Sequence, residues 1–173
     1  DQIRERVEIE GLDRVLTPLR AGRGVVLVTG HFGNWELYAQ LLKVLEGTPA
    51  GTIYRRIGNR FIEAHVRLAR SRFGVRLFER KEGFEEAIRL LREGGMVAVL
   101  ADQHAGQSGV WAPFFDRLAS STPLPALMAL RSGAAMIPCA AYTVGRARWR
   151  CVVEREIGDG RRDVATLTAI VNR

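Results

Sequence analysis

The segment Thr29–Glu36, which reads TGHFGNWE, contains the residue types best suited to catalysis. Imidazole exchanges a proton readily near neutral pH, so His31 is a candidate general base. A carboxylate bonded to one imidazole nitrogen fixes the tautomer and stabilises the positive ring that forms as the other nitrogen takes a proton. Glu36 is the expected partner of His31 in a catalytic pair. The alternative is a histidine that only caps a strand–helix junction.

This segment contains no serine or cysteine. The pair therefore predicts that a substrate hydroxyl attacks directly after His31 removes its proton, without a covalent enzyme intermediate. Gly30 and Gly33 flank His31, and a residue without a Cβ atom permits a tight turn or a close approach to a substrate. Asn34 is a candidate N-cap of the helix that follows and a candidate substrate-binding residue.

Two further segments carry candidate substrate-binding residues at the ends of apolar stretches. Arg80 closes the stretch Gly74–Arg80, and its guanidinium can hold a phosphate by two parallel hydrogen bonds. The alternative is an arginine that is solvated at the edge of a strand. Asp102 and Gln103 follow the apolar stretch 96–101, where they are expected to orient Arg80 or to accept hydrogen bonds from the substrate.

An aromatic pair, Phe114 and Phe115, follows in a stretch that we expect to be a loop. These rings either line a groove for an acyl chain or pack in the core. The three histidines, taken together with Glu36 and Asp102, do not have the spacing of a zinc site. We therefore expect neither a metal ion nor another cofactor.

Short apolar stretches alternate with stretches of helical period along the chain, and these elements must position the candidate residues. The predicted strands are Val25–Thr29, Thr52–Tyr54, Val75–Phe78, Met96–Ala101, Ala135–Thr143 and Trp149–Glu156, and the predicted helices are 34–46, Phe61–Phe73, Phe84–Leu91 and Pro125–Arg131. This alternation predicts an α/β fold with a mostly parallel central sheet flanked by helices. His31 then lies at the carboxyl edge of the sheet, where such folds bind ligands.

Composition indicates a globular protein with an anionic partner. The 173 residues suit one domain, and the formal net charge is +7, carried almost entirely by arginine. Phospholipid headgroups, a phosphorylated substrate, an acidic carrier protein and nucleic acid all fit this charge, as does a simple preference for arginine codons. Aromatic residues are not interleaved with arginines as a nucleic-acid stacking platform needs, so nucleic acid is not the expected partner.

No apolar run is long enough to span a bilayer. Cys139 and Cys151 are expected to be buried free thiols.

Taken in order, these segments resemble the blocks of the glycerolipid acyltransferase superfamily. His31–Glu36 is similar to its first block, His-x-x-x-x-Asp/Glu, Gly74–Arg80 to its second, and Met136-Ile137-Pro138 to its fourth. The form His-Phe-Gly-Asn-Trp-Glu, followed later by Ala-Asp-Gln and Pro-Phe-Phe, is more narrowly similar to the lipid A biosynthesis acyltransferases. The phosphatidylinositol mannoside acyltransferases of mycobacteria belong to the same family.

The resemblance implies a glycerol-3-phosphate acyltransferase-like fold and an acyltransferase that works at the cytoplasmic face of the inner membrane. By this similarity His31 and Glu36 are the catalytic pair, and Arg80 and Asp102 are substrate-site residues. The implied reaction moves an acyl chain from acyl carrier protein to a hydroxyl of a Kdo-lipid A type glycolipid.

Two alternatives stay open. The first is an acyl-CoA-dependent acyltransferase acting on a phospholipid or a phosphatidylinositol mannoside. The second is a non-catalytic basic module that binds lipid or nucleic acid. We also expect residues 1–173 to be a single catalytic domain from a longer protein, without the family's N-terminal anchor and C-terminal tail.

Overall fold

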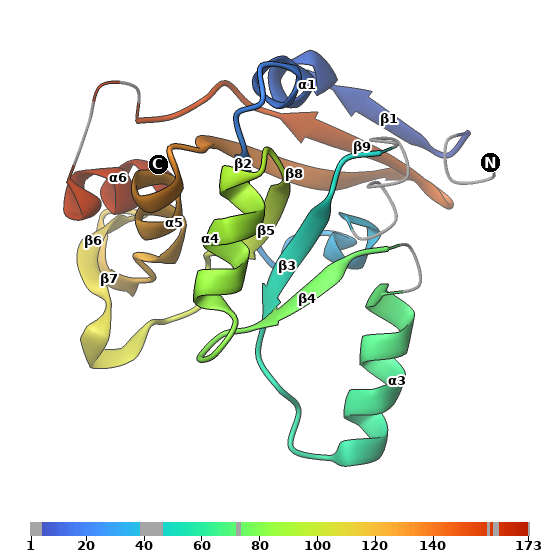
Figure 1. The fold of residues 1–173 in the computed structure, drawn as a ribbon, viewed down its shortest axis with the longest axis horizontal. Helices are drawn as coiled ribbons and strands as arrows, with labels where there is room; N and C mark the ends of the chain where they lie inside the picture. The colour runs from blue at the N-terminus through green and yellow to red at the C-terminus, as the bar shows by residue number, and fades with distance from the viewer. Residues whose placement is uncertain (1–4, 39–46, 72–73, 159, 161–162, 173) are drawn as a thin grey trace.

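A computed structural model describes residues 5–38, 47–71, 74–158, 160 and 163–172 (Figure 1). A twisted sheet forms the centre of the molecule. Helices cover both of its faces, and a separate two-stranded hairpin lies at one side.

The central sheet has seven strands among the described residues, in the order β1-β9-β8-β2-β5-β3-β4. Its strands are β1 (Val7–Glu10), β2 (Val25–Thr29), β3 (Ala50–Tyr54), β4 (Arg76–Glu79), β5 (Met96–Leu100), β8 (Ala135–Gly145) and β9 (Arg148–Val153). All neighbouring strands run parallel except β8 and β9, which form an antiparallel pair. The expected α/β fold with a mostly parallel sheet is therefore confirmed.

Two hydrophobic clusters cover opposite faces of this sheet. On one face, α4 (Phe84–Arg92), α5 (Leu124–Ser132) and α6 (Val164–Val171) pack over Val26, Val28 and their neighbours. On the other face, α1 (Leu12–Arg20) and Tyr38 pack over Val25 and Leu27. Strand β2 is buried along its whole length, which explains why it is an uninterrupted apolar run rather than an alternating one.

Helix α3 (Arg60–Ser71) differs from the other helices, because it stands away from the body of the molecule after β3 (Figure 1). Most of its residues are exposed. Arg70 joins its last turn to the residues that follow β2, through an ion pair with Glu36.

Most predicted helices and strands are present, and the differences concern a hairpin in the middle of the chain, the segment after β2 and the two ends of the chain. The stretch predicted as a loop with Phe114 and Phe115 contains a 3₁₀ turn, η3 (Gly106–Ser108), and an antiparallel hairpin, β6 (Val110–Phe114) and β7 (Arg117–Ser121). Strand β1 and helix α1 were not predicted, and for α6 the sequence indicated a helix only around its last residue, Val171. Of the helix predicted at 34–46, the structure describes a single turn of 3₁₀ helix, η1 (Trp35–Leu37), and positions 39–46, with Leu42 and Leu45, lie outside the described residues.

Candidate active site

Parallel register brings two segments together at the carboxyl edge of the sheet. Thr29 at the end of β2 pairs with Leu100 at the end of β5. The next backbone hydrogen bond, from the Ala101 N–H to the Thr29 carbonyl, is 2.8 Å long. His31 and Asp102 each lie two residues beyond this pair, so the two side chains leave neighbouring strands at the same level.

Asp102 holds His31 by two hydrogen bonds. The backbone N–H of His31 donates to Oδ2 of Asp102 at 2.6 Å, and Nδ1 of the imidazole lies 2.8 Å from Oδ1. An ionised carboxylate only accepts hydrogen bonds, so Nδ1 carries a hydrogen, and in the neutral ring Nε2 then holds the lone pair. This is the tautomer that a general base requires.

Ionisation of Asp102 is favoured by these contacts. Partial burial opposes the charge, but the hydrogen bonds from the ring and the backbone N–H of His31 outweigh it and lower the pKa of Asp102 below its ordinary value. The carboxylate therefore remains charged at neutral pH, as a partner for an imidazolium must be.

The two glycines of the TGHFGNWE segment have separate structural roles. A Cβ atom on Gly30 would lie 3.1 Å from Oδ2 of Asp102, so the missing side chain makes room for the carboxylate rather than for a substrate. Gly33 has φ +58°, and a Cβ atom there would overlap the carbonyl oxygen of Ala141 on β8. The backbone at Gly33 turns tightly against the sheet, as expected.

Glu36 does not bond to His31, which corrects the geometry expected of the pair. Its carboxylate instead makes a bidentate contact with Arg70 on α3, with Nη2 2.6 Å from Oε1 and Nε 3.2 Å from Oε2. The physical reason is the short η1 turn after Asn34, which directs Glu36 toward α3, whereas the sheet register already supplies a carboxylate to the imidazole.

Trp35 links the Glu36–Arg70 ion pair to the imidazole. The guanidinium carbon of Arg70 lies 5.3 Å from the centroid of the Trp35 ring, a cation–π distance. The rings of Trp35 and His31 meet edge to face, with centroids 5.0 Å apart and planes at 70°. Glu36 is therefore linked to His31 through Arg70 and Trp35 rather than by a direct bond.

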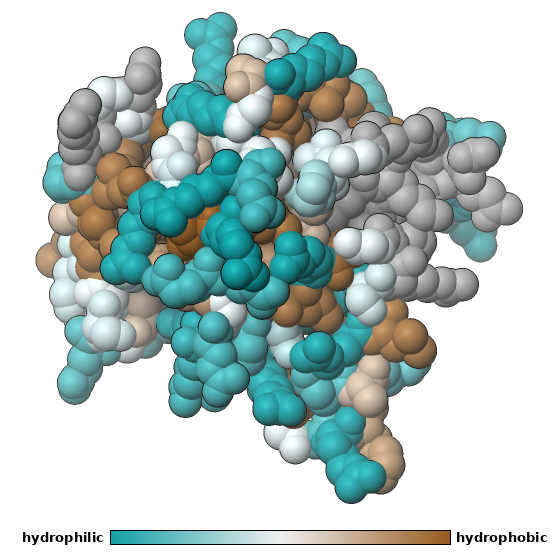
Figure 2. All heavy atoms as spheres, viewed as in Figure 1, coloured by the Kyte–Doolittle hydropathy of each residue, from teal (hydrophilic) through white to brown (hydrophobic). Residues whose placement is uncertain are grey.

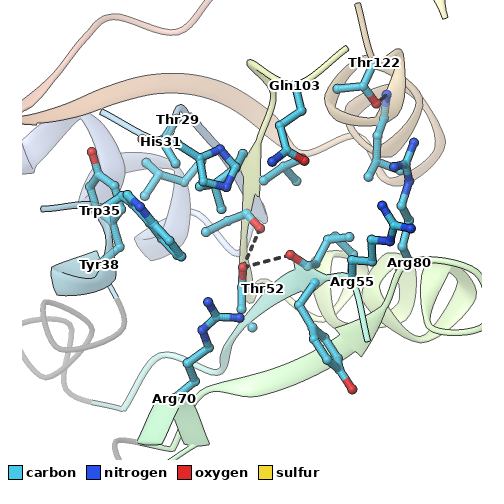
Figure 3. Close-up of a pocket in the computed structure, with 18 of the residues that line it drawn as sticks. Thr29, His31, Trp35, Tyr38, Thr52, Arg55, Arg70, Arg80, Gln103 and Thr122 are labelled. Atoms are coloured by element: carbon cyan, nitrogen blue, oxygen red, sulfur yellow. Dashed lines mark hydrogen bonds between the residues drawn. The ribbon is translucent and has the colours of Figure 1, made fainter. Parts of the chain in front are cut away.

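A cavity of about 350 Å³ opens beside His31. Its floor comes from β2, β5 and β3, and its polar rim includes Arg55, Arg70, Arg80 and Gln103. Figure 3 shows Arg55 and Arg80 on one side of the cavity and His31 with Trp35 on the other.

Arg55 and Arg80 lie at equivalent positions on neighbouring strands. Tyr54 pairs with Glu79, and the Arg80 N–H donates to the Tyr54 carbonyl at 3.0 Å, so each arginine directly follows a paired residue. Within the described part of the chain, neither guanidinium has an ion-pair partner. The site therefore presents two uncompensated cations to a ligand in the cavity.

The other predicted site residues divide into those that line the cavity and those that do not. Gln103 lines the cavity. Asn34 is not among the described residues that line it, and it caps η1 through its backbone without a side-chain cap hydrogen bond. Phe114 and Phe115 are 42% and 85% exposed at the turn of the β6–β7 hairpin, so they do not pack in the core, and they are not among the described residues that line the cavity. Their place in a groove for an acyl chain stays a prediction.

Sequence reasoning missed Arg55 and Arg70. Arg55 ends a predicted strand in the same way as Arg80, and that shared position was the signal available. Arg70 gave no local signal, because its partner Glu36 is brought to it only by the fold.

Among the residues that the structure describes, no three histidine, cysteine, aspartate or glutamate side chains are grouped as metal ligands. Across the same described ranges, no helix is both long enough and apolar enough to cross a bilayer.

Comparison with known proteins identifies relatives of this chain. A phosphatidylinositol mannoside acyltransferase of Mycolicibacterium smegmatis is 27% identical over 172 residues, which cover 95% of this chain and 55% of the relative. One from Mycobacterium tuberculosis is 30% identical over 165 residues, covering 92% and 51%. A lipid A biosynthesis acyltransferase of Haemophilus influenzae is 25% identical over 138 residues, covering 79% and 43%.

The chain thus spans about half the length of the relatives it matches. The family model described as bacterial lipid A biosynthesis acyltransferase matches residues 1–173, the whole chain. This protein therefore belongs to the bacterial lipid A biosynthesis acyltransferase family.

Proposed function

We propose that this protein transfers a fatty acyl chain from an acyl thioester to a hydroxyl of a phosphorylated glycolipid, with His31 as the general base. The observation that carries the proposal is the His31–Asp102 hydrogen bond of 2.8 Å at the edge of a cavity that also presents Arg55 and Arg80. Membership of an acyltransferase family supports the reaction class.

In this mechanism Nε2 of His31 takes the proton of the acceptor hydroxyl as its oxygen attacks the thioester carbonyl. The carbon–oxygen bond forms, and the carbon–sulfur bond breaks as the tetrahedral intermediate collapses. The imidazolium then returns its proton to the departing thiolate, so the enzyme ends unchanged. Asp102 stabilises the imidazolium between these steps, and a base in this position contributes ~10²–10⁴ in rate.

The two arginines without ion-pair partners in the described part of the chain, Arg55 and Arg80, support an anionic acceptor. Each guanidinium can bind a phosphate by two parallel hydrogen bonds, and two of them together match a phosphorylated headgroup better than a neutral sugar. In the proposed mechanism one of these arginines, or a backbone N–H group, stabilises the oxyanion of the tetrahedral intermediate.

The acceptor is a glycolipid in both versions of the proposal. The relative from Haemophilus influenzae is named for lipid A, which makes a Kdo-lipid A type precursor one candidate acceptor. The mycobacterial relatives are named for phosphatidylinositol mannoside and match more of this chain, at 95% and 92% against 79%. That wider match favours the mannosylated inositol lipid as the acceptor.

For the donor we propose acyl carrier protein, with acyl-CoA as the alternative. Acyl carrier proteins are acidic, whereas this chain carries a formal net charge of +7. Long-range attraction raises the encounter rate of such a pair. A thioester donor and a glycolipid acceptor are both consistent with an enzyme at the cytoplasmic face of the inner membrane, which we propose as its location. Nothing in the proposed mechanism requires a cofactor.

The test is a matrix of two donors and two acceptors with the intact purified protein. Mass spectrometry of the extracted lipids should show one acceptor heavier by one acyl group. The matched control is His31→Ala, which should fold normally, as judged by circular dichroism, and lose ~10²–10⁴ in turnover. Normal turnover in that variant would remove His31 from the mechanism, and no product from any combination would overturn the proposed substrates.

A further inference from the structure

Helix α3 has its polar side against the protein and its apolar side in solvent. Glu63, Arg67 and Arg70 follow the spacing i, i+4, i+7, and so they share one side of the helix. Phe61, His65 and Leu68 repeat the same spacing on a different side. In a helix that packs on a hydrophobic core the apolar stripe faces inward, so α3 is reversed.

The inner side of α3 is attached by polar contacts. Glu63 is 7% exposed and accepts hydrogen bonds from the Ile57 N–H at 2.9 Å and the Tyr54 hydroxyl at 3.1 Å. Arg67 donates to the same tyrosine oxygen at 2.5 Å, and Arg70 binds Glu36. These contacts hold the rotation of the helix about its axis, so its apolar side remains outward.

The outer side exposes large apolar side chains. Phe61 is 72% exposed, Leu68 71% and Ile62 52%, and Ala64, His65 and Ala69 are exposed between them. Figure 2 shows hydrophobic side chains along the outer side of this helix, among hydrophilic ones. Scattered apolar residues are ordinary on a surface, but a continuous stripe along one helix marks a binding face.

Arginines border this stripe on one flank. Arg56, Arg60 and Arg67 line a shallow groove on α3 together with Leu68 and Glu63, and the Glu63 carboxylate is paired with Arg67, so the groove has an excess of positive charge. Ile57 lines both this groove and the cavity beside His31, so the two openings are neighbours. A cationic groove beside an apolar stripe matches the phosphates and the acyl region of a phospholipid surface.

We propose that the outer side of α3 docks on a bilayer that contains anionic phospholipid, with Phe61, Ile62 and Leu68 in the interface and Arg56 and Arg60 on headgroup phosphates. The flanking cations favour this occupant over a second copy of this chain, which would bring its own arginines to the contact. Docking goes beyond the acyl-transfer proposal and does not depend on it. It places the cavity mouth at the source of a lipid acceptor.

Vesicle co-sedimentation tests this docking without any turnover. The purified protein is titrated with vesicles of phosphatidylcholine alone and of an equimolar mixture with phosphatidylglycerol. The wild type should bind the mixture more tightly, and added salt should weaken that binding because it screens exposed charges.

Two variants separate the apolar and the electrostatic contributions. Phe61→Ser with Leu68→Ser should lower affinity for the anionic vesicles at least about tenfold, since both large side chains leave the interface. Arg56→Gln with Arg60→Gln should lower affinity only for the anionic vesicles. Each cation near such a surface contributes roughly fivefold, so the pair should cost an order of magnitude or more.

The matched control is Trp111→Ser with Leu118→Ser on the β6–β7 hairpin, where the side chains are exposed to a similar degree, 60% and 68%. This control should bind vesicles like the wild type, and circular dichroism should show all variants folded. Unchanged binding by the α3 variants would overturn the proposal, as would an equal loss in the hairpin control. A dimer that the Phe61→Ser/Leu68→Ser variant dissociates, without any effect on vesicles, would instead identify a second copy as the occupant.

Discussion

The sharpest test of the site compares the two carboxylates near His31. Asp102→Asn replaces the group that bonds to the imidazole, whereas Glu36→Gln replaces the group that pairs with Arg70. Both changes keep size and remove charge. The structure predicts that the loss of turnover in Asp102→Asn is much greater than in Glu36→Gln.

The magnitudes follow from the contacts. A hydrogen bond to a charged group contributes about 1.5–3 kcal/mol, and the amide that replaces the carboxylate in Asp102→Asn can also donate to Nδ1 and move the ring hydrogen to Nε2. A ring with hydrogen on Nε2 cannot accept the substrate proton, so turnover should fall ~10²–10⁴. The Glu36 and Arg70 side chains are 48% and 20% exposed, and a pair of this kind contributes about 1 kcal/mol or less, roughly fivefold.

The assay measures kcat and KM at saturating donor above about pH 5, where the lowered pKa of Asp102 keeps the carboxylate of the wild type ionised. Thermal unfolding of each variant controls for the fold. A greater loss of kcat in Glu36→Gln than in Asp102→Asn, with both proteins folded, would refute the assignment of Asp102 as the partner of His31.

The remaining predictions concern the acceptor, the donor and the fold. Arg80→Ala, and likewise Arg55→Ala, should raise KM for the phosphorylated acceptor more than for the donor. Arg80→Lys should restore only part of the loss, because a point charge replaces a planar fork. Steady-state kinetics with each substrate varied measures this, and an equal rise of both KM values would contradict the prediction. Turnover at low donor concentration should decline more steeply with salt for acyl carrier protein than for acyl-CoA, and equal salt slopes would argue against steering by surface charge. Gly33→Ala should lower the free energy of unfolding by about 1–3 kcal/mol or more, since φ +58° strains any L residue and its Cβ atom meets the Ala141 carbonyl; urea denaturation measures this. The hydrogen bond from the Ile57 N–H is the main cause that lowers the pKa of Glu63, so the charged carboxylate stabilises the fold above its unfolded pKa, and this contribution is lost as the pH falls through the folded pKa. The difference in free energy of unfolding between wild type and Glu63→Gln should therefore close below about pH 4. A difference that is constant from neutral pH to about pH 3 would contradict this prediction.

Local pattern was sufficient for the framework of this fold. The run 25–29 is apolar at nearly every position because β2 is buried on both faces, and α4 could be recognised from its apolar period of 3.6 residues. Both signals depend only on residues within one element. The β6–β7 hairpin was missed because its turn is made by Phe115 and Asp116, both at positive φ, in place of the glycine or asparagine that normally marks such a turn.

Four residues of the site could be named from sequence, but Arg55, Arg70 and the pairing of His31 could not. His31, Arg80, Asp102 and Gln103 were all identified from their position after apolar stretches, since parallel strands carry functional side chains at their carboxyl ends. The local spacing favoured Glu36 as the partner of His31, whereas the partner in the structure is 71 residues away.

Only the tertiary structure decided that pairing, because the order and register of parallel strands are long-range properties that no single segment encodes. The tertiary structure also decided which side of α3 faces the solvent. Its sequence shows an amphipathic helix, and such a helix ordinarily turns its apolar side toward the core. The hydrogen bonds of Glu63 to Tyr54 and Ile57, made between separate elements, turn that side toward the solvent.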